Sequence, residues 1–447
     1  MTLGPDIWAL CNTSLSTPSY ARTKPIHYFL TRAFPRYKFK LERYSLPTNV
    51  SLTRSLQYVQ DWVNMVNLRT FTSLTYLTQV AFLGGNAQTN SSQLRDIVPK
   101  REVLYVGGRY TNITDNATNS TSTAIIGQIY VEKLCPHPAP ADPPLPIIFI
   151  AGAAQTGTNF LDTPDGRPGW ASYFISKGHT VYLSDQPARG RSFWYPGQGK
   201  IGSIGPPSAV SDIFTDVANN GDQWPQAKLH TQWPGTGRFG DATFDAFYRS
   251  QMQFQTDRFI SEEQNAQAYA ALVDLVGDCY IISHSQAGAY GWRVGDMRSD
   301  LVKGIVQLEP SGPPFTLRPP FGNDPAFAFG LTDLAIGYEP SAGKNAENIE
   351  TRIEPAIDAD HNECIMQKSP AKQLTNLAKI PELVVTGEAS FHAPYDYCTV
   401  KYLEQVGVDV EYADLGKEGI HGNGHMFFME KNNLEIADRV YEWLQKH

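Results

Sequence analysis

The chain has 447 residues, a mass of 49.6 kDa and 41% hydrophobic against 18% charged residues, which is enough apolar material for a large buried core. Such a composition excludes a mainly disordered or coiled-coil protein. The net charge of −8 and the lack of a long basic run exclude the electrostatic footprint of a nucleic-acid-binding protein.

The first 99 residues are interpreted as an N-terminal extension. No apolar run in the sequence reaches the 18 residues of a transmembrane helix, so no membrane span is predicted. The segment 65–87 has a short basic start, an apolar middle and a small-residue end, which is typical of a signal peptide. It predicts a secreted protein that begins near Gln88. Alternatively, residues 71–83 form an ordinary helix or strand on the core, which also suits a cytoplasmic protein.

Acceptor triplets for N-glycosylation, of the form Asn-x-Ser/Thr, all lie before residue 122. They begin at Asn12, Asn49, Asn90, Asn112, Asn116 and Asn119. The polar, turn-rich stretch 112–123 is expected to be an exposed loop between two strands. This clustering favours the secretory route and predicts a glycoprotein.

Five Cys residues are too few for a disulfide-built fold. Cys279 lies at the mouth of a very apolar strand and is expected to be a buried thiol. Cys364 and Cys398 are therefore the one pair that we expect to form a disulfide.

From residue 100 to 447, short β-rich runs alternate with helical patterns, which indicates one large domain. An antiparallel strand pair is expected at 103–110 and 124–133. Parallel strands are expected at 146–151, 180–184, 279–283, 301–308, 381–386 and 408–415. Helices are expected at 169–177, 262–276, 287–297, 395–406 and 433–446. This alternation is typical of an α/β fold with a doubly wound, mostly parallel sheet.

Two long interruptions, at about 192–260 and 310–370, do not fit this alternation. Loops of this length inside a domain usually act as lids or binding elements, so we expect two lid insertions. Their aromatic residues either line a pocket for a bulky apolar substrate or form the core of the lid. Those of the second insertion are Phe315, Phe321, Phe327 and Phe329.

Ser285 lies at a predicted strand-to-helix turn. It follows the apolar run 280–282, and the small residues Ser283 and Ala287 stand two positions before and after it. A nucleophile elbow needs small residues there, because its strained turn brings the strand and helix backbones close together. The pattern predicts that Ser285 is a nucleophile. The alternative is a serine-rich turn that caps a helix.

A nucleophilic serine needs a base. When the serine stands at an elbow of a doubly wound sheet, its partners follow in the chain order Ser, acid, His. His425 follows the last predicted strand within the Gly-rich run 422–426, on a loop that can aim the ring at the elbow. We therefore predict His425 as the base and expect His421 to be an exposed or structural loop residue. His284 is expected to pack in the elbow.

The acid has three candidates. Glu309 ends an otherwise apolar strand, where a carboxyl group needs a specific partner to be buried. Glu388 and Asp396 follow the next strand, where this fold more often places its acid. The burial argument favours Glu309 as the group that orients the imidazole.

Acyl transfer also needs hydrogen-bond donors for the oxyanion. One expected donor is the backbone N–H of Gln286, the residue after the nucleophile. The second is expected in the loop after the strand run 147–150, at Ala153, with Ala154 as the near alternative. Small residues there let the backbone approach a substrate.

Four segments carry a resemblance to a known family. They are 152–160, then 163–170 with 185–192, then the elbow followed by 308–310, and finally 424–433. In these segments the chain resembles the α/β-hydrolase superfamily, and it is similar to the bacterial serine esterase subgroup whose Ser–Glu–His triad has its acid after strand six. The likeness covers about residues 100–447. It implies that Ser285 is the nucleophile, Glu309 the acid and His425 the base.

These features predict a serine hydrolase that cleaves a small-molecule carboxylic ester or lactone through an acyl-enzyme. No metal or cofactor is expected, because the sequence has no metal-ligand or phosphate-loop motif. The alternatives are an acyltransferase or peptidase on the same scaffold, or a secreted binding module without catalysis. A homodimer is compatible with the sequence, although no motif specifies an oligomeric state.

Overall fold

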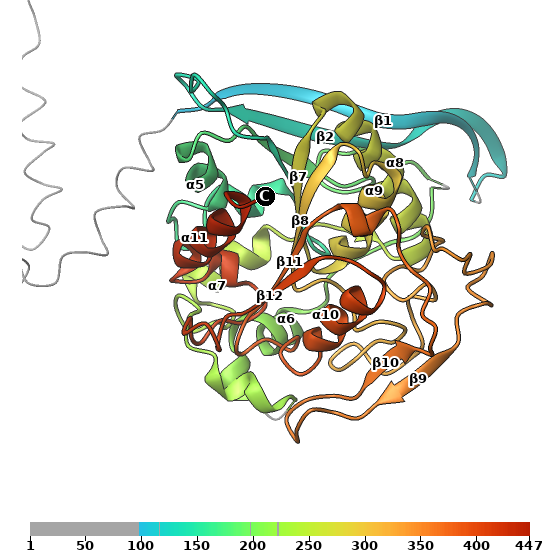
Figure 1. Ribbon diagram of the computed structural model, residues 1–447. Helices are drawn as coiled ribbons and strands as arrows, with labels where there is room; N and C mark the ends of the chain where they lie inside the picture. Colours follow the sequence, from blue (N-terminus) through green and yellow to red (C-terminus); the bar gives the residue numbers. More distant parts are fainter. Residues whose placement is uncertain (1–97, 116, 197, 221–222) are drawn as a thin grey trace, which may run out of the picture. The chain divides into compact units, whose positions relative to one another are not determined.

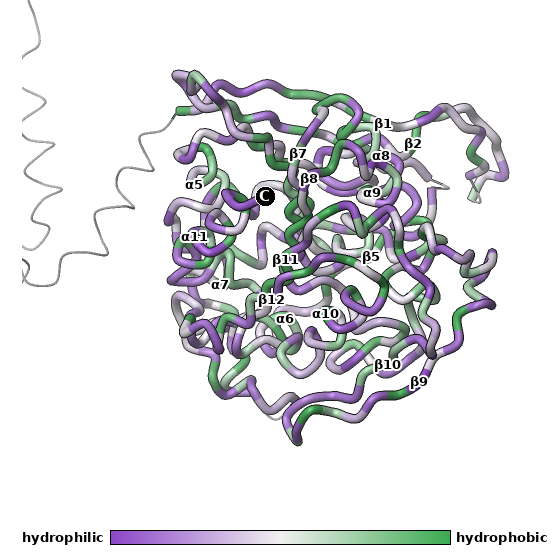
Figure 2. Tube along the Cα trace, viewed as in Figure 1, coloured by the Kyte–Doolittle hydropathy of each residue, from purple (hydrophilic) through white to green (hydrophobic). Residues whose placement is uncertain are grey.

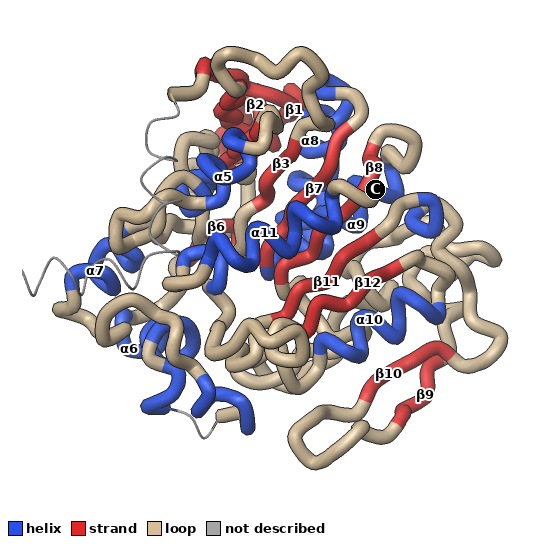
Figure 3. The backbone as a smooth tube through the Cα atoms, turned by 60° about the vertical axis from the view of Figure 1, so that its left-hand side comes forward, coloured by secondary structure: helices blue, strands red, loops and turns tan. Residues whose placement is uncertain are grey.

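An eight-stranded sheet forms the centre of the domain, with the strand order β1-β2-β4-β3-β7-β8-β11-β12 (Figures 1 and 3). The computed structural model describes residues 98–447 except 116, 197, 221 and 222. The predicted signal-like segment 65–87 and the acceptor triplets up to Asn90 lie outside the described residues. The strands are β1 (Lys100–Asp115), β2 (Ser120–Cys135), β3 (Ile147–Ile150), β4 (Val181–Asp185), β7 (Cys279–His284), β8 (Val302–Leu308), β11 (Glu382–Thr386) and β12 (Val410–Asp414).

The sheet is mostly parallel, as the sequence predicts. The six strands from β4 to β12 pair in parallel, while β2 is antiparallel to both β1 and β4. Strands β3, β4, β7 and β11 are buried along their whole length, which is why they appear as continuous apolar runs rather than alternating ones. Figure 2 shows hydrophobic residues gathered along the central strands β7, β8 and β11.

Helices cover both faces of the sheet. Ile147 and Phe149 of β3 pack into the core on one face, and Ile148 and Ile150 into the core on the other. The first face is covered by α5 (Trp170–Ser176) and α11 (Asn433–Leu444). The second is covered by α8 (Arg258–Val276), α9 (Gly288–Met297) and α10 (Asp396–Gln405). The alternation of side chains along a strand thus divides the interior into two apolar layers.

The β1–β2 hairpin differs from the expected exposed loop at 112–123. The strands pair as far as Asp115 with Ser120, so Asn112 lies within β1 opposite Thr123. The Thr123 hydroxyl donates to Asn112 Oδ1 at 3.0 Å. Apart from the buried Ile113, mostly Thr, Ser and Asn side chains form this part of the hairpin, so no regular hydrophobic alternation marks the extension in the sequence.

The segment 192–260 folds as a set of short elements. They are β5 (Ile201–Gly202), α6 (Pro207–Val210), η2 (Ser211–Thr215), η3 (Val217–Asn220), η4 (Pro225–Leu229), α7 (Ala242–Arg249) and β6 (Phe254–Gln255). Phe214, Trp224, Trp233 and Phe247 from this segment join the apolar core around α5 and α11. The segment is therefore packed onto the domain by its aromatic residues.

The segment 310–370 contains the hairpin β9 (Thr351–Glu354) and β10 (Cys364–Gln367). Cys364 is disulfide-bonded to Cys398 of α10, as predicted, and Cys279 is a buried free thiol. Phe327 and Phe329 are buried, whereas Phe321 is half exposed. Within the described residues, none of the helices has the length and apolar character that a membrane span requires.

Candidate active site

The parallel strands deliver the candidate residues to one edge of the sheet. Ser285 follows β7, Glu309 follows β8, and the loop that carries His425 follows β12. The loop with Ala153 follows β3. Because neighbouring parallel strands end at the same edge, residues far apart in the sequence converge there.

Ser285 occupies a strained turn between β7 and α9. Its φ of 55° lies in the left-handed region, which costs a non-glycine residue about 1–3 kcal/mol and is typical of functional sites. The turn also needs small neighbours: a Cβ on Gly288 would lie 2.4 Å from Cβ of Pro310, and one on Gly152 would lie 3.1 Å from Cβ of Ser285. The predicted strand-to-helix turn is present, with Ser285 half-buried at its tip.

His425 is paired with Glu309. The Nδ1 atom of His425 lies 2.5 Å from Oε2 of Glu309, and both side chains are buried. Glu309 also accepts the N–H of Gly387 and the hydroxyl of Ser390, each at 2.7 Å. The carboxyl group is thereby fixed on three sides, and Nδ1–H of His425 donates to it. This tautomer leaves Nε2 of His425 free to accept a proton.

The two alternative acids pair with other histidines. Asp396 accepts the Thr386 hydroxyl at 2.7 Å and lies 2.9 Å from Nδ1 of His392. Glu388 lies 2.9 Å from Nδ1 of His421, whose side chain is 65% exposed. The structure therefore brings only Glu309 of the three candidates to His425.

Burial shifts the pKa of both groups of this pair. It lowers the pKa of His425 well below the ordinary value of 6.5, and the neighbouring rings of His284 and His392 lower it further. Burial also raises the pKa of Glu309, while its hydrogen bonds from Ser390 and Gly387 act in the opposite direction. His425 is thus neutral at neutral pH, the form that can take a proton.

The acid limb of the pH profile of kcat/KM is expected to lie below pH 6.5, because a lowered pKa keeps His425 neutral in more acidic solution. The measurement is kcat/KM from about pH 4 to about pH 9. His421→Gln is the control and is expected to leave the limb in place, since that ring is exposed. A limb at or above pH 6.5 in the wild type would contradict this assignment.

Two further histidines flank His425. Nε2 of His284 lies 3.2 Å from the backbone carbonyl of His425, to which it donates, and burial lowers the pKa of His284 to about 3. His392 stacks on His425 with ring centroids 5.0 Å apart and an interplanar angle of 4°. His284 packs in the elbow as expected. His392 and Ser390 were not predicted from the sequence as members of the site. The only signal for them is that they follow β11, the strand next to the one that precedes Glu309.

Glu309, His392 and His425 form the one group among the described residues whose metal-ligating atoms all lie within 4.8 Å of one another. Nδ1 of His425 is already bonded to Glu309, and Nδ1 of His392 to Asp396. Hydrogen bonding therefore accounts for this cluster.

The loop after β3 lies against the elbow. Ala153 is half-buried and lines the same cavity as Ser285 and His425. Ala154 is fully buried with a φ of 58°, and its carbonyl accepts the N–H of Met252 at 2.8 Å. Of the two alternatives, Ala153 is thus the one that lines the cavity.

The cavity at Ser285 has a volume of about 150 Å³. Its apolar walls come mostly from the segment 192–260, with Phe321 and Met426 completing them. The members from that segment are Ile204, Ala209, Val210, Ile213, Phe214, Phe247 and Phe254. This volume is below the usual range of about 300–1,000 Å³ for pockets that take drug-sized ligands.

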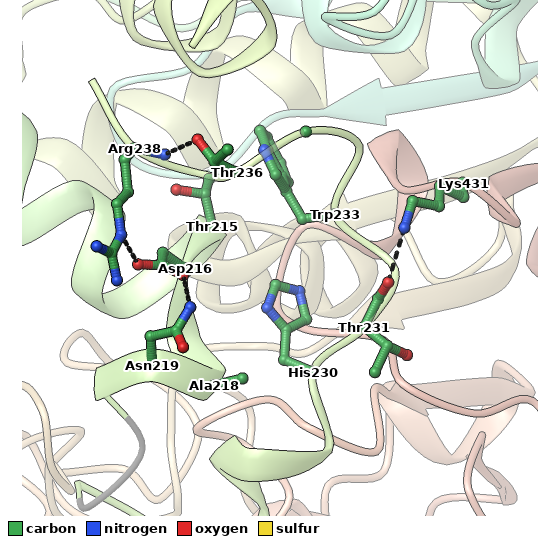
Figure 4. A pocket seen from close by; sticks show the side chains of 11 residues that line it. Thr215, Asp216, Ala218, Asn219, His230, Thr231, Trp233, Thr236, Arg238 and Lys431 are labelled. Atoms are coloured by element: carbon green, nitrogen blue, oxygen red, sulfur yellow. Dashed lines mark hydrogen bonds and ion pairs between the residues drawn. The ribbon is translucent and has the colours of Figure 1, made fainter. Parts of the chain in front are cut away.

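A second cavity, of about 630 Å³, is lined mostly by polar residues of the same segment, together with Lys431 (Figure 4). Its charged groups pair with one another or with the backbone: Arg238 with Asp216, and Lys431 with the carbonyl of Thr231 at 2.9 Å. His230, also on its wall, lies 2.6 Å from the buried Glu430 carboxylate. This cavity lacks the nucleophile and base found at the first one.

Comparison with known proteins gives one relative and a set of similar folds. No family model matches the chain. A protein of Fungal sp. (strain ATCC 74256), described as "Probable secreted lipase phiG", is 58% identical over 343 residues, which cover 77% of this chain and 89% of the relative. A solved structure described as a novel bacterial esterase has a TM-score of 0.52 at 20% identity, covering 78% of this chain and 96% of that one. The second likeness concerns the fold alone.

Proposed function

Because the chain belongs to the α/β-hydrolase family of lipases and esterases and is a carboxylic-ester hydrolase, we propose that Ser285, Glu309 and His425 form its catalytic triad. The observation that carries the proposal is the 2.5 Å contact between Nδ1 of His425 and Glu309, beside the strained turn of Ser285. Together, this contact and this turn offer a nucleophile, a base and an orienting acid beside one cavity.

The proposed reaction has two halves. Nε2 of His425 takes the proton of the Ser285 hydroxyl as Oγ attacks the ester carbonyl, and then gives it to the leaving alcohol. Glu309 stabilises the imidazolium that forms between these steps. The backbone N–H groups of Ala153 and Gln286 hold the oxyanion. Water, activated by His425, then releases the acyl group and restores Ser285.

The enzyme is secreted, as its relative is described to be. The Cys364–Cys398 disulfide agrees with an oxidising compartment. Asn112 and Asn119 are exposed on the β1–β2 hairpin, and we propose them as glycan acceptors. A homodimer stays a prediction.

The substrate is a small-molecule ester. The apolar walls of the cavity agree with the predicted apolar substrate, but its volume of about 150 Å³ does not support a bulky one. We therefore propose that the cavity takes a short apolar acyl group of an ester or lactone, with Phe214 and Phe247 on its walls.

The proposal is tested by incubating the purified protein with a fluorophosphonate probe and by following hydrolysis of p-nitrophenyl esters of increasing acyl length. We expect labelling of the wild type and of Ser176→Ala, a control at an exposed serine of α5, but not of Ser285→Ala. We expect kcat/KM to be highest for short acyl chains, because the cavity is small.

Either of two results would overturn the triad assignment: a folded wild type that is neither labelled nor active, or a Ser285→Ala variant labelled as fast as the wild type. A preference for long acyl chains would overturn the proposed acyl group while leaving the triad in place.

A further inference from the structure

Building on the proposed function, we propose that Arg189 is a positioning residue of the oxyanion site, which joins the loop of Ala153 to Gln286 and strengthens the Ala153 N–H as a donor. Arg189 lies in the turn after β4 and does not border the cavity of Ser285. It therefore acts through its neighbours.

The guanidinium group bridges the two halves of the oxyanion site. Its Nη1 donates to the carbonyl oxygens of Gly152 at 2.6 Å and Gln155 at 3.2 Å, on either side of Ala153. Its Nη2 donates to Oε1 of Gln286 at 3.0 Å. One planar group thus fixes the loop after β3 relative to the residue that follows the nucleophile, and only Arg offers donors in this forked arrangement.

The hydrogen bond from Arg189 to the carbonyl of Gly152 acts on the peptide group that carries the Ala153 N–H. The carbonyl of Gly152 and the N–H of Ala153 belong to the same peptide group and, in a trans peptide, point in opposite directions. A charged donor on the carbonyl polarises this group and makes its N–H a stronger donor on the other side. Gln186, from the same turn, holds the preceding carbonyl of Ala151 at 2.5 Å.

The charge of Arg189 is placed unusually. Its side chain is only 1% exposed, and among the described residues no carboxylate forms an ion pair with it. Burial lowers its pKa to about 10, so it stays protonated at neutral pH. The charge of Asp185 acts on this pKa in the opposite direction, but Asp185 is ion-paired with Arg191. A buried cation without an ion pair of its own is costly. Negative charge that forms in the transition state beside Ala153 compensates for it, so this cost falls during the reaction.

Arg191 provides a matched control on the same turn. It forms ion pairs with Asp185 at 2.7 Å and with Glu132 at 2.8 Å, and its guanidinium lies 3.8 Å from the ring centroid of Tyr130. These contacts brace the turn without reaching the loop of Ala153. Loss of Arg191 therefore loosens the turn while keeping the hydrogen bonds of Arg189 to the loop of Ala153 and to Gln286.

The experiment compares Arg189→Met, Arg189→Lys and Arg191→Met in steady-state kinetics on a short-chain p-nitrophenyl ester, with active enzyme counted by exhaustive fluorophosphonate labelling. For Arg189→Met we expect kcat to fall about 10²-fold with KM within about threefold, and the affinity for a boronic acid that mimics the tetrahedral intermediate to fall in proportion. Arg189→Lys, which keeps the positive charge but not the forked set of donors, is expected to lower kcat about tenfold. Arg191→Met is expected to lower the melting temperature and leave kcat within about threefold.

A merely structural Arg189 would give unchanged boronate affinity and kcat per labelled site, and that result overturns the proposal. If Arg189→Met does not fold, the proposal is tested with Gln286→Met, Arg189→Lys and the double variant. Gln286→Met removes the side-chain acceptor of Arg189 but keeps the backbone N–H. The proposal expects the losses of kcat in the two single variants to be non-additive in the double variant, and additive losses overturn it. Failure of wild-type labelling would instead overturn the triad itself.

Discussion

Glu309→Gln is expected to lower kcat by about 10³–10⁴-fold with a small change in KM. The carboxylate accepts three hydrogen bonds, from Gly387, Ser390 and Nδ1 of His425. A Gln amide offers only one oxygen, so its NH₂ group would face one of these donors. The variant also loses the negative charge that stabilises the imidazolium. Both effects act on proton transfer by His425 rather than on substrate binding, so the loss falls on kcat.

Glu388→Gln is the control for this prediction. Glu388 also pairs with a histidine, but with His421 on the surface, 2.9 Å away. We expect it to retain kcat within about threefold, with kcat measured per fluorophosphonate-labelled site. Loss of activity in Glu388→Gln together with a fully active Glu309→Gln would move the acid to Glu388. Thermal unfolding of both variants shows whether each is folded.

The central sheet could be predicted from the sequence because its strands are buried on both faces. A run such as 147–150 must be apolar throughout when helices cover both sides, and this signal survives without any tertiary information. The ends of β1 and β2 could not be predicted. There the pairing of Asn112 with Thr123 continues where Ile113 is the one buried hydrophobic residue of β1, so no hydrophobic period marks it.

The members of the candidate site were predictable where local chemistry constrains them. Ser285 is marked by the small residues that its strained turn requires, and Glu309 by the anomaly of an acid at the end of an apolar strand. The partners of Arg189 could not be predicted, because they lie 37, 34 and 97 residues away. Such contacts depend on the order of the strands in the sheet, which brings these distant segments together.

The aromatic residues of the long segments show the same limit. The sequence left open whether they line a pocket or form a lid core, and the structure divides them. Trp224 and Trp233 are buried in the core, whereas Phe254 and Phe321 line the cavity, and Phe214 does both. Only the three-dimensional packing distinguishes these environments, and it also determines the cavity volume on which the proposed acyl group depends.

Glu382 links the stability of the domain to pH. It lies in β11 with 1% of its surface exposed, and its Oε2 accepts the indole N–H of Trp292 at 2.9 Å. Its other oxygen, Oε1, is buried without a hydrogen-bond partner. Burial of this carboxyl raises its pKa from 4.5 to about 8. The folded chain therefore prefers the protonated carboxyl, and the stability that it contributes is fully present below pH 4.5 and lost as pH rises through about 8.

Glu382→Gln is expected to remove this loss, because a neutral amide does not ionise. Between about pH 4.5 and about pH 9, the free energy of unfolding of the variant should rise relative to the wild type by roughly 3–5 kcal/mol. Urea unfolding of both proteins at several pH values measures this. The decisive quantity is the change of their difference with pH, since the unpartnered amide NH₂ costs the same at every pH.

Glu347→Gln is the matched control. Glu347 is exposed, and hydrogen bonds from backbone N–H groups lower its pKa, so its contribution has the opposite sign: it is present above the ordinary pKa and lost as pH falls. We expect this variant to gain nothing at about pH 9. If the difference in the free energy of unfolding between Glu382→Gln and the wild type stays constant with pH, the prediction is wrong. Water or a rearranged neighbour would then solvate the Glu382 carboxylate, and burial on β11 would not control its ionisation.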